Sequence, residues 1–173
     1  MVERKTSERN EMKTALPLFV LALAVAAPPA NAQNAGQIAR VRAGSSCPGC
    51  NLFQADLSGL ERSGLNLRGA RLRQADLSLS VLNRAGLSNA DLRDVEAYGA
   101  VLSSSNLSGA NLTNGGFVGA FLDGADFSGA TLTGANFSGA SLERARGLTQ
   151  ARLNQACGDE ATRLPRGLRL PAC

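Results

Sequence analysis

Residues 125–144 read ADFSG ATLTG ANFSG ASLER, four blocks of five in which the third position holds a large apolar residue. The same period extends back to residue 50, so these third positions, here called centres, fall every five residues from 52 to 142. Seventeen of the nineteen centres are Leu or Phe, and the exceptions are Arg62 and Ala97. Two residues before the centre, sixteen of nineteen residues are Ala, Ser, Gly or Cys, and two residues after it ten are Gly.

A period of five fits neither an α-helix, which repeats every ~3.6 residues, nor a β-strand, which repeats every ~2 residues. An apolar centre and a small residue two positions earlier point to one side of an extended segment, and a following glycine permits a corner. The sequence therefore predicts a chain that turns every five residues and keeps one side inward. Such a chain is a solenoid, in which each coil buries its inner face only against its neighbours.

The blocks ADLSG, ANLTN, ADFSG, ATLTG, ANFSG and ASLER resemble those of the pentapeptide-repeat family, and the resemblance covers residues 50–144. It implies an all-β fold, a right-handed quadrilateral β-helix with four blocks per coil. Nineteen blocks give between four and five coils. At ~4.8 Å between coils, the expected rod is about 23 Å long.

Two centres interrupt the pattern. With twenty residues per coil, Ala97 lies beneath Phe117, so the small side chain would make room for the ring. A buried, unpaired Arg62 would be costly. Either its side chain reaches out at the open end of the first coil, or that coil is distorted and Leu60 and Leu65 supply the missing apolar volume.

The N-terminal segment has the order of a secretory signal. Ala15–Ala27 is apolar and uncharged, basic residues precede it, and Pro28-Pro29 and the small-x-small triplet Ala30–Ala32 follow it. Thirteen apolar residues are too few to cross a bilayer, which needs ~20. We therefore expect a signal peptide at residues 1–32 and a periplasmic or secreted mature protein; an uncleaved anchor or a buried helix is the alternative.

The remaining chain divides into three parts. Residues 33–49 are expected to form an N-terminal cap, as either a short helix or a strand, and the repeats occupy residues 50–144. Residues 145–173 are expected to cap the other end, with Thr149 capping a short helix at residues 150–157 and an irregular basic tail after it.

Four cysteines stand at the two ends of the expected rod: Cys47, Cys50, Cys157 and Cys173. Four cysteines allow three connectivities. Disulfides need Cα atoms within ~7 Å, so a rod of the expected length leaves only Cys47–Cys50 and Cys157–Cys173. Export favours their oxidation. The separation also argues against a shared zinc site, and a Cys-x-x-Cys that leads directly into repeats lacks the context of a catalytic dithiol.

Stacking at twenty-residue intervals aligns two surface stripes, each just before its centres. An acidic stripe would hold a cation, meet a basic partner or simply remain solvated. An apolar stripe would mark an interface, unless it reflects ordinary β-propensity. Arg71 also aligns with Asp91 as an expected exposed ion pair. The acidic stripe consists of Asp56, Asp76 and Glu96, and the apolar stripe of Val81, Val101 and Phe121.

Composition and charge argue against several functional classes. The chain has no His, which is the commonest general base and metal ligand. Residues 50–142 contain six Arg and eight acidic residues, a net charge of −2. The resemblance brings to mind inhibition of DNA gyrase by mimicry of duplex DNA. A mimic ~23 Å long would need about fourteen negative charges, at one per ~1.7 Å. The net charge of −2 therefore argues against mimicry of DNA.

We therefore predict an exported, non-catalytic structural or protein-interaction module, with no cofactor and no metal. Its expected partner is an unidentified protein or a second copy of the chain. No nucleic acid and, after signal cleavage, no membrane are expected as partners. The alternative is an enzyme, a thiol–disulfide oxidoreductase that uses Cys47 and Cys50.

Overall fold

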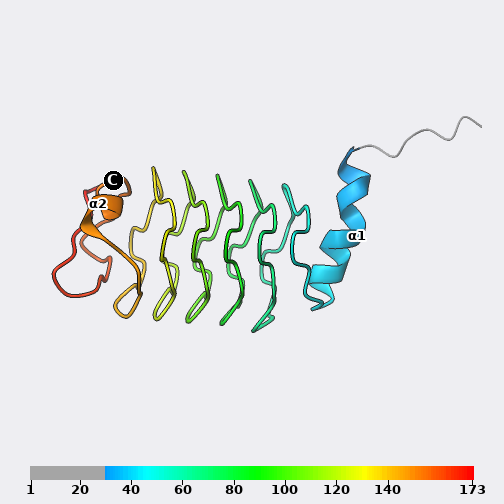
Figure 1. Cartoon of the computed structure of the whole chain (residues 1–173), viewed down its shortest axis with the longest axis horizontal. Helices are drawn as coiled ribbons and strands as arrows, with labels where there is room; N and C mark the ends of the chain where they lie inside the picture. Colours follow the sequence, from blue (N-terminus) through cyan, green and yellow to red (C-terminus); the bar gives the residue numbers. More distant parts are fainter. Residues whose placement is uncertain (1–29) are drawn as a thin grey trace, which may run out of the picture.

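The computed structural model describes residues 30–173. Helix α1 (Ala30–Arg42) comes first, a stack of coils follows, and a single helical turn, α2 (Gln150–Leu153), comes after the coils. Figure 1 shows the coils side by side in a row, with α1 across one end and α2 and the C-terminal tail at the other. The predicted signal peptide lies outside the described residues, apart from its last three positions, which begin α1.

The coils repeat every twenty residues. Sixteen parallel bridges join residues twenty apart, from Asn51–Arg71 to Asp126–Arg146, and successive bridges are offset by five residues. Each coil therefore has four sides, as the resemblance implied. The pairings within residues 30–173 are single bridges and not extended strands. The expected all-β fold is therefore correct for the pairing between coils, which is parallel β pairing, but the backbone of each side is too short to form a regular strand.

The corners explain the frequent glycines. All eighteen residues that stand two places after a centre, from Gln54 to Gly139, have positive φ angles. Glycine adopts this left-handed conformation without strain, whereas other residues do so at a cost. Leu79, with φ of 57°, is the bulkiest apolar residue at such a corner, and it is 63% exposed.

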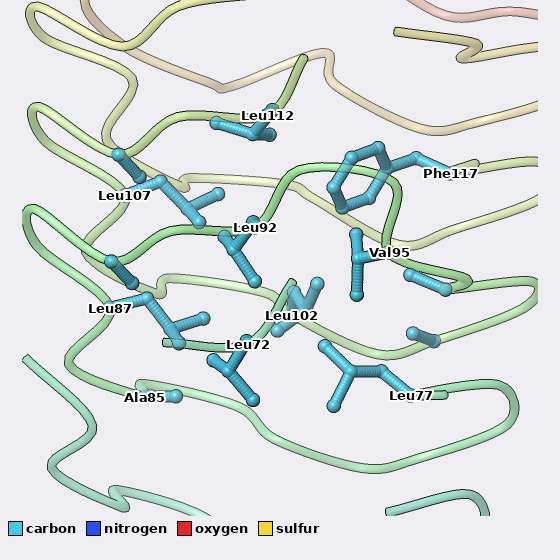
Figure 2. Packing of buried hydrophobic residues seen from close by; sticks show 14 of the residues in the cluster. Leu72, Leu77, Ala85, Leu87, Leu92, Val95, Leu102, Leu107, Leu112 and Phe117 are labelled. Atoms are coloured by element: carbon cyan, nitrogen blue, oxygen red, sulfur yellow. The ribbon is translucent and has the colours of Figure 1, made fainter. Parts of the chain in front are cut away.

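Every centre from Leu52 to Leu142 except Arg62 is at most 1% exposed. Figure 2 shows several of these side chains, labelled between Leu72 and Phe117, pointing toward the axis of the rod. Full burial of a Leu or Phe side chain contributes ~2 kcal/mol before conformational entropy is subtracted. In the described coils the side chains of the centres fill the axis, so candidate sites are sought on the outer surface and at the two ends of the rod.

Both irregular centres have local explanations. The Arg62 side chain lies at the surface, where its guanidinium donates to the carbonyl oxygen of Glu61 at 2.7 Å. At the other exception the order of sizes is reversed, because Val95, two residues before Ala97, is the larger and is fully buried. Figure 2 shows Val95 beside Phe117.

The Phe117 ring accounts for a further small residue. It stacks on Phe137 with 5.4 Å between ring centroids. A Cβ atom added to Gly115 would come within 2.7 Å of the Phe117 ring. Gly115 therefore stands where most other repeats carry Ala because the ring occupies that space.

The N-terminal end of the rod is closed by α1. Val41 is fully buried in the core, and the side chain of Gln37 accepts a hydrogen bond from the backbone N–H of Asn51 at 2.6 Å. The segment of undecided secondary structure is therefore helical up to Arg42. Neither helix in the described part of the chain has the length and apolar run that crossing a membrane requires.

At the C-terminal end the helix is shorter than predicted. Thr149 accepts from the N–H of Arg152, as an N-cap does, but α2 ends at Leu153 and does not reach residue 157. The next residues pair with the last coil instead, through the bridges Asn136–Cys157 and Ser141–Arg163. The edge of that coil offers unpaired backbone groups, and satisfying them stabilises extended backbone over further helix.

Candidate interaction surface

The apolar stripe predicted from the sequence forms one continuous ladder. Val81 bridges to Val101, and Val101 bridges to Phe121. The two valines are half-buried, and Phe121 is 51% exposed. The structure thus brings the three residues together on one side of three consecutive coils.

Three further apolar residues, which the sequence analysis missed, extend this stripe around the adjacent corner. Leu79 donates its N–H to the carbonyl oxygen of Tyr98 at 2.8 Å, and Gly99 donates to that of Val118 at 2.9 Å. Tyr98 is 59% exposed. Three of the four exposed large apolar residues among residues 34–173 lie here, and Phe53 is the fourth. We call this surface the corner strip; it consists of Leu79, Val81, Tyr98, Val101, Val118 and Phe121.

A sequence signal for the extension existed. Leu79 occupies a corner position at which Gly is commonest, and Tyr98 is the only tyrosine in the chain. Both residues are therefore outliers against the repeat. The twenty-residue register alone does not find them. It was also necessary to consider the residues that lie two or three positions before Val81 and Val101 in the chain, on the other side of the corner.

The acidic stripe also forms one ladder, from Asp56 through Asp76 to Glu96. Its members differ in their surroundings. Asp56 lies 3.4 Å from the guanidinium of Arg42, and hydrogen bonds from Ser58 lower the pKa of Asp56. Asp76 and Glu96 have no ion-pair partner within residues 30–173. The described residues contain no group of three or more His, Cys, Asp or Glu that could hold a metal ion.

The opposite edge of the corner strip carries hydrogen-bond acceptors. Asp123 accepts from the hydroxyl of Ser141 through one carboxylate oxygen at 2.7 Å. Its other oxygen, Oδ1, is shielded from solvent and has no donor among the described residues, and the same holds for Oδ1 of Asn83. Asn83 also lines a shallow pocket of about 260 Å³ with three serines and Arg84.

The predicted ion pair between Arg71 and Asp91 is wrong. Their backbones bridge, but the Asp91 carboxylate accepts two hydrogen bonds from Arg93, at 2.7 and 2.6 Å. These bonds lower the pKa of Asp91. Arg93 wins because it stands two residues away on the same coil, where its side chain reaches both carboxylate oxygens.

The cysteines lie as two separate pairs, with Cα–Cα distances of 5.5 Å for Cys47–Cys50 and 4.9 Å for Cys157–Cys173, and both pairs are bonded. Cys47 is 2% exposed and Cys50 is 8% exposed. A dithiol that exchanges with a substrate has to be accessible to it, so this burial argues against the oxidoreductase alternative. Cys173 is exposed and lines a cavity of about 490 Å³ between the tail and the last coil.

Comparison with known proteins identifies the repeats. The sequence profile of the family described as pentapeptide repeats (8 copies) matches residues 63–96, 82–115 and 117–146. The chain belongs to the pentapeptide-repeat family. Membership of this family implies a right-handed β-helical solenoid, which agrees with the twenty-residue register of the bridges.

Solved structures of other pentapeptide-repeat proteins resemble the chain. One is a protein of the Arabidopsis thaliana thylakoid lumen, 26% identical, with 68% of this chain and 59% of that chain covered and a TM-score of 0.33. Another is QnrB1, a plasmid-mediated fluoroquinolone resistance protein, at 24% identity, with 74% and 78% covered and a TM-score of 0.36. A search of curated proteins gives no match.

A third solved structure is HetL from the cyanobacterium Nostoc, a pentapeptide-repeat protein involved in the regulation of heterocyst differentiation. It is 23% identical, with 80% of this chain and 94% of HetL covered and a TM-score of 0.29. The chain spans only 59% of the length of the lumenal protein. These similarities concern the fold alone. They do not assign the roles of the three proteins to this chain.

Proposed function

We propose that this pentapeptide-repeat protein is an exported, non-catalytic module that presents the corner strip to a protein partner. The observation that carries the proposal is the clustering of exposed Leu79, Tyr98 and Phe121 around one corner of the rod. Contiguous exposed apolar surface, edged by polar residues, is typical of protein interfaces. Tyr and Phe are also among the residues enriched in such interfaces.

The backbone beneath the strip favours this role. Each of its coils donates hydrogen bonds to the next at fixed positions, such as Leu82 to Val101 and Leu102 to Phe121, both at 2.8 Å. The side chains are therefore held at a constant spacing before any partner arrives. A pre-ordered surface binds without the entropic cost of ordering a loop.

Two features support export. The order of charged, apolar and small residues in the first 32 positions is that of a secretory signal. All four cysteines are paired at the ends of the rod, and disulfides persist in oxidising compartments. Intact-mass measurement of the protein from its native host tests this part: a chain that begins at Gln33 and has no alkylatable thiol is expected. A full-length chain with free thiols would contradict export.

The interaction is tested by cross-linking in the native host. A photo-reactive phenylalanine analogue placed at residue 121 should cross-link to one protein, or to a second copy of the chain. The matched control is the same analogue at Thr131, an exposed residue that also stands just before a centre but on the opposite side of the rod. Specific cross-links from residue 121 should vanish when Tyr98→Asp is added. Equal cross-linking from both positions would remove the corner strip from consideration.

A further inference from the structure

We propose that the corner strip binds an amphipathic α-helix of a partner protein, with an apolar stripe flanked on both sides by Lys or Arg. This inference rests on the proposed function and names the class of partner. It follows from the spacing of the apolar side chains and from the polar groups on the two edges of the strip.

The spacing of the strip suits a helix laid along the rod. Each coil contributes one apolar rung, and the three rungs consist of Leu79 with Val81, Tyr98 with Val101, and Val118 with Phe121. Coils of a β-helix stack ~4.8 Å apart, and an α-helix advances ~5.4 Å per turn. Successive turns of a helix can therefore place apolar residues against successive rungs.

The edge formed by the acidic stripe calls for positive charge. Asp76 and Glu96 stand on the side that precedes the corner, next to the rungs of Leu79 and Tyr98. Neither carboxylate has an ion-pair partner in the described part of the chain, whereas Asp56, Asp91 and Asp94 each have one. Asp76 and Glu96 therefore place unpaired negative charge beside the corner strip.

The other edge carries a negative charge at its Phe121 end, that of Asp123. The Oδ1 atoms of Asn83 and Asp123 are shielded from solvent and lack donors within the described residues. Both residues stand two places after the apolar residues Val81 and Phe121, on the same side of the rod. Neither shielded oxygen is open to a partner's side chain, but the Asp123 carboxylate carries a negative charge with no ion-pair partner in the described residues, and Lys or Arg would complement that charge.

The same groups disfavour two other occupants. An anionic membrane surface would meet uncompensated carboxylates, which it repels. A second copy packed through its own strip would bring acidic edges together, and like charges placed across an interface cost binding energy. A helix with basic flanks is the occupant that satisfies the apolar rungs and both edges.

Binding is tested with designed peptides and the full disulfide-bonded protein. The probe is a fluorescent peptide of about 18 residues with Leu at i, i+3, i+4 and i+7 spacing and Lys on both flanks. The control peptide carries Glu in place of every Lys. Fluorescence anisotropy should show binding of the Lys peptide about tenfold tighter than that of the Glu peptide, and this preference should shrink as salt is raised.

Variants of the protein assign the binding to the strip. Phe121→Asp and Tyr98→Ala should each weaken binding of the Lys peptide about tenfold or more, as interface anchors do. Glu96→Lys should weaken it several-fold. The matched control Thr131→Asp, on the opposite side of the rod, should leave it unchanged. All four positions are exposed, and unchanged thermal melting will show that each variant folds.

Three results would overturn the inference. They are equal binding of the Lys and Glu peptides, an equal loss with Thr131→Asp, and Phe121-dependent binding to phosphatidylglycerol vesicles in place of the peptide. A dimer that Phe121→Asp dissociates would assign the strip to a second copy. If the Lys peptide fails but the cross-link from residue 121 persists, the interaction function stands and only the class of partner is wrong. If both fail, both proposals fall.

Discussion

In the coils between residues 51 and 146, every centre but Arg62 is at most 1% exposed, and the backbone of each coil bonds to the next. In the tail from Asp159 to Cys173 no residue is fully buried. The tail contacts the rod through the disulfide, through several hydrogen bonds and through three partly buried leucines, Leu164, Leu168 and Leu170. Where they meet, the bridges Asn136–Cys157 and Ser141–Arg163 join residues 21 and 22 apart, so the tail keeps the parallel pairing but not the twenty-residue register. The comparison shows that backbone pairing alone does not make a segment stable, because the coils add full apolar burial, whereas the tail adds partial burial and a covalent link.

The largest expected effect comes from deleting apolar volume in the coils. Phe117→Ala should lower the free energy of unfolding by about 3–5 kcal/mol, since the ring is fully buried and stacks on Phe137. Leu170→Ala in the tail should cost less than about 1 kcal/mol, because that side chain is only half-buried. Urea denaturation of the two variants measures the difference, and equal losses would contradict the contrast between the regions.

Removing the tail's covalent link should have the next largest effect. Cys157→Ser with Cys173→Ser opens a loop whose ends are 16 residues apart and should cost about 3 kcal/mol in the chain-entropy description. Amide hydrogen exchange should accelerate in residues 158–173, while the exchange of the coils stays close to that of the unmodified protein. Exchange that accelerates throughout the coils would mean that the tail holds the whole rod together.

A stabilising substitution should be available inside the coils. Ser105 is 1% exposed, its hydroxyl has no hydrogen-bond partner in the described structure, and it occupies a position that Ala fills in most other repeats. Ser105→Ala should therefore raise the free energy of unfolding by about 1 kcal/mol. Ser103→Ala, on the outer surface of the same coil, serves as the control and should change little. A loss of stability in Ser105→Ala would reveal a hydrogen bond to a buried water.

The smallest effect concerns acid. The Asp159 carboxylate accepts hydrogen bonds, first from the backbone N–H of Gly139, and these lower the pKa of Asp159 in the folded protein. A lowered pKa means that the bonds stabilise the tail above the carboxyl's unfolded pKa of about 3.9 and are lost as pH falls through the folded pKa. Tail amides should exchange faster in acid, relative to their intrinsic rates, and Asp159→Asn should reduce this sensitivity. An unchanged pH profile in the variant would exclude Asp159 as its cause.

The coils could be predicted from the sequence because their determinants repeat. A centre such as Leu102 and a small partner such as Ala100 are recognisable from any neighbouring block, and the family profile agrees. The expected length of the rod excluded a bond between cysteines at opposite ends, so each cysteine was expected to pair within its own end. The structure places Cys157 near Cys173 accordingly. The five-residue spacing decided the prediction of the coils, and the separation of the cysteines along the rod decided the prediction of their pairing.

The ends and the candidate surface were harder to predict because non-repeating contacts decide them. Helix α2 stops at Leu153 because the following residues pair with the last coil, a competition that helix signals around Thr149 do not reveal. Leu79 and Tyr98 join the apolar stripe across a corner, at spacings that are not multiples of twenty. Asp91 pairs with Arg93 and not with Arg71, because the reach of a side chain, and not the twenty-residue register, selects its ion-pair partner.

The four-sided coil also governs how a gene for such a protein can change in length. Inserting or deleting twenty residues adds or removes a whole coil, and every downstream side chain keeps its side of the rod. Inserting five residues preserves the inward leucines and the corners but turns everything downstream by a quarter of a revolution. An insertion of one block between Val101 and Val118 would thus keep an apolar residue at every inward centre that has one now, but would move the rung of Val118 and Phe121 away from the other two rungs of the corner strip. In this architecture a recognition surface can be taken apart or assembled by slippage of single blocks, without any substitution in the core.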